Sequence, residues 1–495
     1  MNAKLRVAAI GLLLAVLGGL VLLVVRPSLN PAHHVRPLPL IALAWIAFLA
    51  AAFLLRSVPR RGAVALILLG GIAIQIAAVS APPRQSDDLY RYIWDGRVQA
   101  AGIDPYAYVP TARQLTGLRD EFLWHHGADH CLSAAYVGSH AAADLVAGCT
   151  LINRPAVPTI YPPVAEAYFY GVHYLPGGNS STTTIQAATA GFAVLTTVVL
   201  MFGLGRLRRD VRMAALWAWC PTVALEAGNS AHVDVVAVAI TAAALMLLAS
   251  AARRPLRTVL GAVLLGLAIA TKVTPALTVP AVLRRRWMTV CACAGSAFVV
   301  VYLPHVLAVG SKVIVFLPGY LQQEGYVSGR RFGIIGLVLG GKLAIVMAVL
   351  ILAVVAFAVL QFTDPDRPWQ GALVMTAAAL AVTTPRYQWY ALLLVMLVAL
   401  DGRPEWLAFA AGAYYAAEPN LGRYTLPNRL HDAVAYGVPI VVVGAGWAVR
   451  EFVARRSAGL EPVPVVAAEP AVVAAEPVLV AEPVVAAEAV AGVPV

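Results

Sequence analysis

Charged residues are scarce in this sequence. Asp, Glu, Lys and Arg make up 12% of its 495 residues, whereas soluble globular domains carry about 25%. Hydrophobic residues account for 60% of the chain, and the mean hydropathy is +0.78. This shortage of charge excludes an ordinary soluble domain and predicts an integral membrane protein.

Acidic residues are scarcer than basic ones. The chain has 25 Asp and Glu against 36 Lys and Arg, which gives a formal net charge of +11. A basic balance can indicate nucleic-acid binding, but here Lys and Arg cluster at the ends of apolar runs rather than along one solvated face. We therefore interpret them as charges that set membrane topology, and we expect no nucleic-acid partner.

Cysteine is also rare, with five residues in the whole chain. Cys131 and Cys149 fall in a long stretch between apolar runs, whereas Cys220, Cys291 and Cys293 fall in or beside such runs. If the long stretch lies in an oxidising compartment, Cys131 and Cys149 can form a disulfide. Two unpaired thiols are the alternative, and the sequence leaves both open.

Apolar runs of about 18 residues recur, each long enough to cross a hydrocarbon core of about 30 Å as a helix. Lys4 and Arg6 precede the first run, which lacks a small-residue cleavage site, so we expect a retained signal anchor and a cytoplasmic N-terminus. The basic residues that follow later runs place the C-terminus in the cytoplasm too. We expect spans near 7–25, 38–55, 62–80, 185–202, a run ending at 226, a run from 234 to 252, then 289–309, 333–360, 369–383, 387–400, 404–417 and 433–449. With a further hairpin, this predicts an all-α polytopic protein with about 12 to 14 transmembrane helices.

Three other segments complete the predicted organisation. Residues 81–184 form a large extracytoplasmic loop of the membrane body, residues 1–458, and residues 459–495 form a disordered Ala/Val/Pro/Glu-rich tail that repeats Ala-Glu-Pro. Within the loop, residues 89–101 mix aromatic and charged side chains. They predict a short helix, which either lies in the lipid headgroup layer or packs on the protein.

A membrane hairpin is predicted over residues 258–283. Both flanks are basic, and Thr271-Lys272-Val273-Thr274-Pro275 lies at the middle of the apolar run. Arms of about 13 residues reach only about 20 Å, which is short of a full crossing. Lys272 should therefore lie deep in the membrane body, towards its outer side.

The charge-derived topology brings several polar groups to the outer side. Asp87 and Asp88 follow the third span, and a lysine buried in a membrane hairpin is costly unless it is paired, so Lys272 is a functional candidate. The alternatives are a helix cap or solvated turn for the aspartates, and an internal ion pair or snorkelling for Lys272. The remaining candidates on that side are Asn229, His232, Asp234, Arg330, Arg331 and Arg386, for which helix capping, solvation or interfacial anchoring are the structural alternatives.

A metal site is not expected. His125, His126, Asp129, His130 and Cys131 are close in sequence, but their spacing matches no closed zinc pattern. We predict no metal and no cofactor.

Five motifs in order resemble a known family. They are the Asp87-Asp88 pair, Tyr161-Pro162-Pro163, the string from Asn229 to Asp234, Ala-Thr-Lys-Val-Thr-Pro at 270–275 and Thr-Pro-Arg-Tyr at 384–387. Across about residues 84–436 the chain resembles the GT-C glycosyltransferases of actinobacteria. It is most similar to the polyprenyl-phosphomannose-dependent α-mannosyltransferases of lipomannan and lipoarabinomannan core synthesis, particularly the α-1,6 enzymes.

The resemblance implies a GT-C-type fold in the plasma membrane with an extracytoplasmic active site. It implies a polyprenyl-phosphate-mannose donor, a lipid-linked mannan acceptor, surrounding membrane lipids and inversion at the anomeric carbon. Because phosphate is already a good leaving group, one base suffices, and we assign it to Asp87 or Asp88. Cations would hold the donor phosphate, namely Lys272, Arg330, Arg331 and Arg386. The acceptor or sugar would meet Asn229, His232, Asp234 and Tyr161, although Tyr161 can equally serve to shape the loop.

Two other functions fit parts of the sequence. A GT-C transferase could use another polyprenyl-phosphate sugar, such as arabinose, because nothing in the sequence names the sugar. A lipid or solute transporter would also be polytopic, and the hairpin at Lys272 could be one of its broken helices. The two halves of the chain show no convincing internal repeat, which favours the transferase.

Overall fold

The computed structural model describes residues 3–26, 38–124, 150–249, 254–417 and 428–458. In these ranges the chain is helical and forms no strand, apart from one isolated bridge between Trp124 and Thr150. Apolar helices satisfy every backbone hydrogen bond internally, as lipid requires. The all-α polytopic fold predicted from the sequence is thus confirmed.

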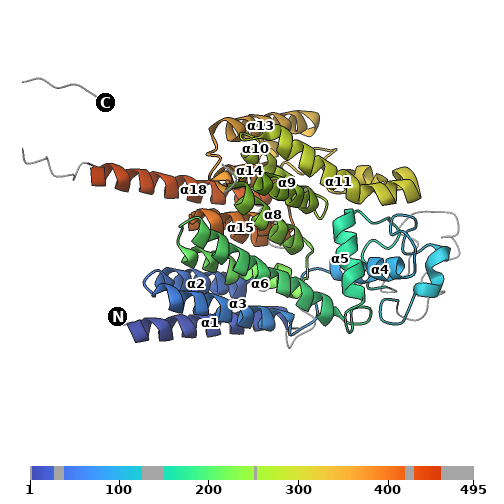
Figure 1. Cartoon of the computed structure of the whole chain (residues 1–495), viewed down its shortest axis with the longest axis horizontal. Helices are drawn as coiled ribbons and strands as arrows, with labels where there is room; N and C mark the ends of the chain where they lie inside the picture. Colours follow the sequence, from blue (N-terminus) through green and yellow to red (C-terminus); the bar gives the residue numbers. More distant parts are fainter. Residues whose placement is uncertain (1–2, 27–37, 125–149, 250–253, 418–427, 459–495) are drawn as a thin grey trace, which may run out of the picture. The chain divides into compact units, whose positions relative to one another are not determined.

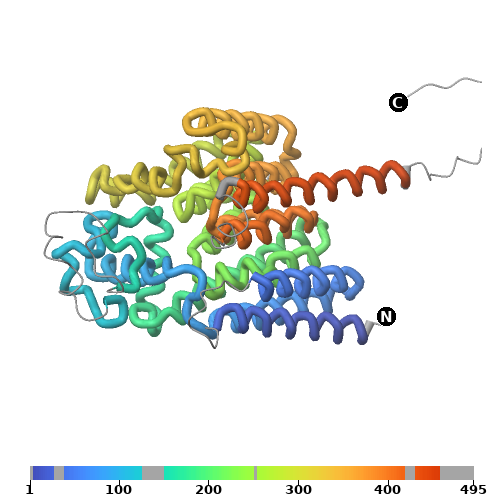
Figure 2. The backbone as a smooth tube through the Cα atoms, turned by 180° about the vertical axis from the view of Figure 1, so that it is seen from behind, coloured from blue at the N-terminus to red at the C-terminus, as the bar shows by residue number. Residues whose placement is uncertain are grey.

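The first three predicted spans are helices with nearly the expected bounds. They are α1 (Ala3–Val25), α2 (Leu38–Leu55) and α3 (Arg60–Val79). Helix α1 packs along α2 and α3, and α3 also packs on α6 (Thr182–Arg206). Figures 1 and 2 show this blue bundle beside the green α6.

A sharply broken helix follows α6. After η5 (Val211–Ala214) and α7 (Ala215–Ala218), the π-helix η6 (Val223–Asn229) and helix α8 (Asp234–Ala249) meet at 118°. At the break, backbone and side-chain polar groups lie outside a regular helix. They face protein and not lipid, because residues 223–239 are buried throughout. The predicted polar string from Asn229 to Asp234 is this break.

The predicted hairpin is also present as a break. Helix α9 (Pro255–Ile269) ends just before Lys272, and the second arm consists of two short pieces, η7 (Thr274–Thr278) and α10 (Val279–Val282). Helix α11 (Trp287–Val309) then packs along α9. Lys272 therefore lies in an irregular turn inside the helical body.

The later helices surround one that is wholly enclosed. Every residue of α15 (Ala391–Asp401) is buried, and α15 packs against α7, α8 and α14 (Pro368–Thr383). The other helices of this part of the chain are α13 (Gly341–Phe362), which precedes α14, and α16 (Ala408–Ala416) and α18 (Asn428–Ala458), which follow α15. Short pieces connect them: η8 (Gly310–Ile314), α12 (Leu317–Gln323), η9 (Ile335–Leu337), η10 (Gln388–Tyr390) and η11 (Pro404–Leu407).

Seven helices of the described ranges are long and apolar enough to cross a membrane, or eight if the bent pair η6 and α8 is one span. The sequence predicted about 12 to 14 transmembrane helices. Much of the difference lies in the apolar runs that form α9, α14, α15 and α16, whose helices have 15, 16, 11 and 9 residues. Helices this short contribute to the membrane body without matching its full thickness.

The large loop carries three helical segments, α4 (Asp88–Ala100), η1 (Arg113–Leu118) and α5 (Pro163–His173). Helix α4 was predicted either to lie in the lipid headgroup layer or to pack on the protein. The structure supports packing on the protein, because Leu89, Tyr92 and Trp94 are buried and α4 lies against α5 (Figure 1). Gly96 permits this close approach, since a Cβ there would lie 2.5 Å from the carbonyl oxygen of Phe169.

Several predictions concern residues outside the described ranges. The histidine-rich stretch His125, His126, Asp129, His130 and Cys131, the pair Cys131 and Cys149, and the tail 459–495 all belong there. The cysteines in the described part, Cys220, Cys291 and Cys293, are free thiols.

Candidate active site

The approach to Asp87 and Asp88 is held by Asn229. Its side-chain amide nitrogen donates to the carbonyls of Ala78, Ala81 and Pro82 at 3.1, 3.2 and 3.1 Å. Its side-chain oxygen accepts from the Arg84 amide at 2.9 Å. Asn229, which was predicted to contact the sugar, is only 1% exposed. Its side chain instead holds the segment that leads from α3 to α4 through these hydrogen bonds.

The two aspartates differ in environment. Asp87 is exposed, whereas Asp88 begins α4 and its side chain is 19% exposed. The Asn153 side-chain nitrogen donates to an oxygen of each carboxylate, at 3.1 Å for Asp87. Burial raises the pKa of the Asp88 carboxyl above its ordinary value, although Lys272 and Asn153 oppose the shift. The raised pKa makes the Asp88 carboxylate a stronger base than an ordinary aspartate.

Behind Asp88 lies a buried histidine. His232, in the break between η6 and α8, has Nδ1 at 3.7 Å from Asp88 Oδ2 and Nε2 at 3.5 Å from Glu226 Oε2. The Tyr414 hydroxyl donates to Glu226 Oε1 at 2.8 Å, and the His232 ring stacks on Trp389 at 3.9 Å. His232 is 0% exposed, and neither of its ring nitrogens has a hydrogen-bond partner among the described residues.

Lys272 forms an ion pair at the same place, with its own side chain half-buried and that of Asp234 buried. Its Nζ lies 3.0 Å from Asp234 Oδ2, at the first residue of α8, and 5.3 Å from the centroid of the Tyr161 ring. The pair joins the two helix breaks, so the turn after α9 and the start of α8 hold each other in position. Burial raises the pKa of the Asp88 carboxyl, and the charge of Lys272 opposes that shift.

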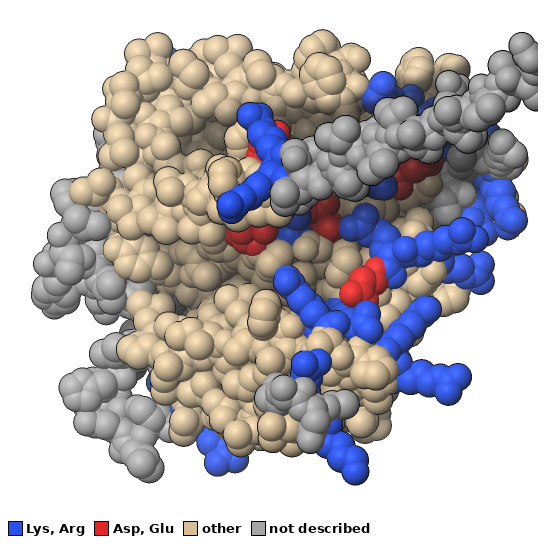
Figure 3. Space-filling view, turned by 90° about the vertical axis from the view of Figure 1, so that its left-hand side faces the viewer, with Lys and Arg blue, Asp and Glu red and all other residues tan. Residues whose placement is uncertain are grey.

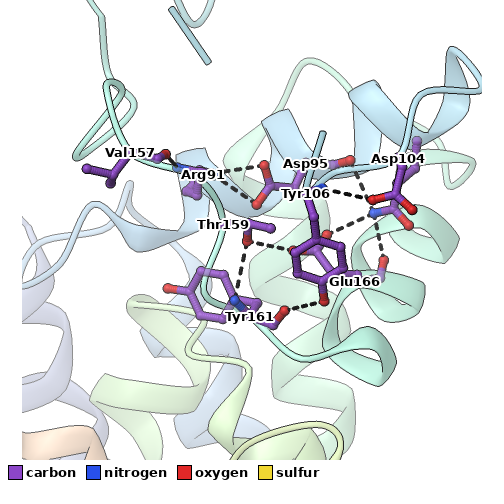
Figure 4. A network of polar contacts seen from close by, with 9 residues as sticks. Arg91, Asp95, Asp104, Tyr106, Val157, Thr159, Tyr161 and Glu166 are labelled. Atoms are coloured by element: carbon purple, nitrogen blue, oxygen red, sulfur yellow. Dashed lines mark hydrogen bonds and ion pairs between the residues drawn. The ribbon is translucent and has the colours of Figure 1, made fainter. Parts of the chain in front are cut away.

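Figure 4 shows how the loop fixes Tyr161. The Tyr161 amide donates to Thr159 Oγ1 at 3.3 Å, and the Tyr106 hydroxyl donates to the Tyr161 carbonyl at 2.6 Å. Thr159 Oγ1 donates in turn to Glu166 Oε1 at 2.7 Å. The Tyr161 backbone is thus tied to the loop, while its ring faces Lys272 and packs edge-on to Tyr92.

A second charged cluster centres on Glu324, just after α12. Glu324 Oε1 lies 3.3 Å from Arg154 Nη2, and Oε2 lies 3.0 Å from Arg331 Nη2. The Tyr387 hydroxyl donates to Oε1 at 3.0 Å. Arg154 connects this cluster to the aspartates, because it follows Asn153 and interacts electrostatically with Asp88.

The other two predicted phosphate ligands have different contacts. Arg386 Nη2 pairs with Asp432 Oδ2 at 2.9 Å, and Arg330 Nε donates to Ser328 Oγ at 3.2 Å at the surface. The structure therefore brings Asp88, His232, Asp234, Lys272 and Tyr161 together, and it connects Arg331 to them through Glu324 and Arg154. Arg330 and Arg386 belong to neighbouring contacts.

The sequence reasoning missed Asn153, Arg154, Glu226 and Glu324. Glu324 carried one usable signal, because it is a lone acidic residue in the otherwise uncharged stretch between Lys312 and Arg330. Arg154 and Asn153 occur in a polar loop with no motif around them, so only the fold brings them to Asp88. In the described ranges, no three His, Cys, Asp or Glu residues lie close enough together to hold a metal ion.

A buried acid pair beside the site should make stability depend on pH. Burial, and then the charge of Asp95, raise the pKa of the Glu166 carboxyl well above its ordinary value, so folded Glu166 keeps a proton that the unfolded chain releases. This contribution is complete below the ordinary pKa and is lost as pH rises through the folded pKa, at about 1.4 kcal/mol per pH unit for one proton. We expect Glu166→Gln to flatten the fall in apparent Tm from pH 5 to 9, measured in detergent. An unchanged slope would contradict this prediction.

The comparison with known families gives one match. The model of glycosyltransferase family 87 matches residues 159–385, a segment that includes Tyr161, His232, Asp234, Lys272 and Arg331 but begins after the aspartate pair. No curated protein and no solved structure matched the chain. Together with the helical membrane architecture, the family match indicates a membrane glycosyltransferase.

Proposed function

We propose that this membrane glycosyltransferase transfers mannose from polyprenyl-phosphate mannose to a lipid-linked mannan acceptor, with inversion and in α-1,6 linkage. The observation that carries the proposal is the position of Asp88. A carboxyl with a raised pKa interacts electrostatically with the half-buried Lys272 and with Arg154, which supports a base next to cations that suit a phosphate. The match to a glycosyltransferase family supports the same reaction class.

The proposed reaction moves one negative charge. Asp88 takes the proton of the acceptor hydroxyl as the oxygen attacks the anomeric carbon, and the bonding electrons leave with the phosphate. The donor phosphodiester carries one negative charge and the product phosphate two, while Asp88 becomes neutral. The total charge is unchanged, and the charge arrives where Lys272, Arg154 and Arg331 can stabilise it.

The predicted acceptor residues divide into two groups under this proposal. Tyr161 offers an aromatic ring beside Lys272 and is proposed to contact the sugar. His232, Asp234 and Asn229 have their side chains turned to protein partners. We propose that these three are positioning residues that hold Asp88 and Lys272.

The distribution of basic residues supports an extracytoplasmic site. Figure 3 shows many Lys and Arg side chains on the face that forms the left side of Figure 1, whereas Figure 1 has α4 and α5 on its right. Helix α3 begins with Arg60, and α6 ends with Arg206. Because positive loops mark the cytoplasmic side, we propose that Asp88 faces outward across the plasma membrane and that both termini are cytoplasmic.

A panel of donors tests the proposal. Membranes containing the full-length protein, or its Asp88→Asn variant, are incubated with radiolabelled polyprenyl-phosphate mannose, glucose or arabinose and with a short α-mannoside acceptor. We expect label transfer from the mannose donor alone, with loss of transfer in Asp88→Asn. Transfer from the arabinose donor would replace the proposed sugar, and donor movement across vesicles without consumption would favour a transporter.

A further inference from the structure

Glu324 occupies an unusual position for a carboxylate in this protein. Its side chain is 5% exposed and lies between two guanidinium groups, with Arg154 at 3.3 Å on one oxygen and Arg331 at 3.0 Å on the other. The Tyr387 hydroxyl donates to the first oxygen at 3.0 Å. A single anion thus accepts hydrogen bonds from Arg154 and Tyr387 and forms an ion pair with Arg331, and these three partners come from three different parts of the chain.

This donor set suits a phosphate at least as well as a carboxylate. Guanidinium groups bind phosphate oxygens in the same forked geometry, and charge-assisted hydrogen bonds of this kind are about twice as strong as neutral ones. Two arginines against one glutamate leave a net positive charge. An anionic oxygen group is therefore the chemical class that could take the place of Glu324.

The cluster also belongs to the site of Asp88. Arg154 follows Asn153, whose side-chain nitrogen donates to both aspartates. The Arg154 guanidinium lies 6.0 Å over the ring of Tyr320, and the Tyr320 hydroxyl is hydrogen-bonded to that of Tyr390 at 2.7 Å. Arg154 thus lies between the aspartates and Glu324, where the phosphate of a bound lipid would be close to both.

We propose that Glu324 is an internal substitute for the substrate phosphate: it holds Arg154 and Arg331 in position, and the phosphate of a polyprenyl lipid displaces it from them. The inference rests on the proposed function only in placing a lipid phosphate at this site, and it is independent of the sugar. Arg154 becomes a phosphate ligand that the sequence did not reveal.

Glu324 lies where it can move away from the two arginines. Glu324 directly follows α12, none of whose residues is buried, and Leu317 and Leu321 of that helix are exposed. Releasing the two ion pairs therefore allows the turn after α12 to move without opening a packed core. When the phosphate product has formed, Glu324 competes with it for the same arginines and so promotes its release.

Binding of farnesyl phosphate to the full-length protein in detergent tests the exchange. Because apparent affinity is the intrinsic affinity multiplied by the fraction of time the site is free of a competing group, Glu324→Gln should bind farnesyl phosphate about tenfold more tightly. Arg154→Met should bind it about tenfold more weakly. Matched controls are Glu121→Gln and Arg113→Met, which change exposed residues of the loop that carries Arg154 and should bind as the unaltered protein does.

Weaker or unchanged binding by Glu324→Gln would overturn the inference, because Glu324 would then be a scaffold for the arginines and not a competitor. Glu324→Ala, which cannot hydrogen-bond to either arginine, is the second variant if the first does not fold, and tighter binding is expected there too. In the transfer assay, Glu324→Gln should also be inhibited by about tenfold less farnesyl phosphate.

The two proposals fail in different ways. If the protein transfers no mannose but the binding series follows the expected order, the proposed function is wrong and the role of Glu324 stands. If mannose is transferred while Glu324→Gln binds farnesyl phosphate less tightly, the role of Glu324 is wrong and the proposed function stands.

Discussion

Asp88→Asn should lower kcat by about 10²- to 10⁴-fold, the range in which loss of a general base falls. Asparagine has nearly the same shape, so the contacts of Asp88 with Asn153 and Ser86 can largely be retained, and the loss should reflect the missing base. The measurement is initial transfer rate per mole of folded protein, with detergent-extracted yield and apparent Tm as checks on folding.

Asp87→Asn is the matched control, because Asp87 has the same chemistry and the same Asn153 partner but is exposed. We expect less than about tenfold loss.

The pH profile gives a second check. A base acts only when it is ionised, and burial raises the pKa of Asp88. As the pH is lowered, activity should therefore be lost at a higher pH than it would be with an exposed aspartate as the base. Equal losses in the two variants would refute the assignment of the base to Asp88.

Lys272→Met should lower kcat by about 10²- to 10³-fold, comparable to removing one donor that stabilises developing charge. The cause is the loss of a half-buried cation that interacts electrostatically with Asp88, at the place where negative charge is proposed to appear on the phosphate. The single variant also leaves Asp234 buried without its lysine, so some loss of stability is expected as well.

A double variant separates the two effects. In Lys272→Met/Asp234→Asn both charges are removed, so stability should recover towards that of the unaltered protein while transfer stays low. Apparent Tm and single-turnover transfer are measured in parallel for the single and double variants. Recovery of transfer together with stability would show that Lys272 serves only its pair with Asp234.

The grouping of polar residues was the part of the site that the sequence could predict. Counting spans and basic ends placed Asp88, Asp234 and Lys272 on one side, and the structure joins Lys272 to Asp234. The same reasoning could not separate Arg331 from Arg330, because one residue of offset decides whether a side chain meets Glu324 or the surface. Nor could it find Arg154, whose partner Glu324 is 170 residues away.

Span length was harder to predict than helix position. The runs of α14, α15 and α16 were found within a few residues, because apolar composition marks them clearly. Their lengths match membrane thickness poorly, since they are enclosed by other helices and do not need to satisfy lipid on their own. Burial by protein and burial by lipid require the same apolar residues, and a sequence does not distinguish them.

The enclosure of α15 has a consequence for how the protein is made. Its 11 residues rise only about 16 Å, roughly half of a hydrocarbon core, and all of them are buried by the rest of the chain. Such a segment is a poor independent substrate for membrane insertion. Helix α15 should therefore enter the bilayer together with α14. It should reach its final depth late in assembly, only when α7 and α8 close around it.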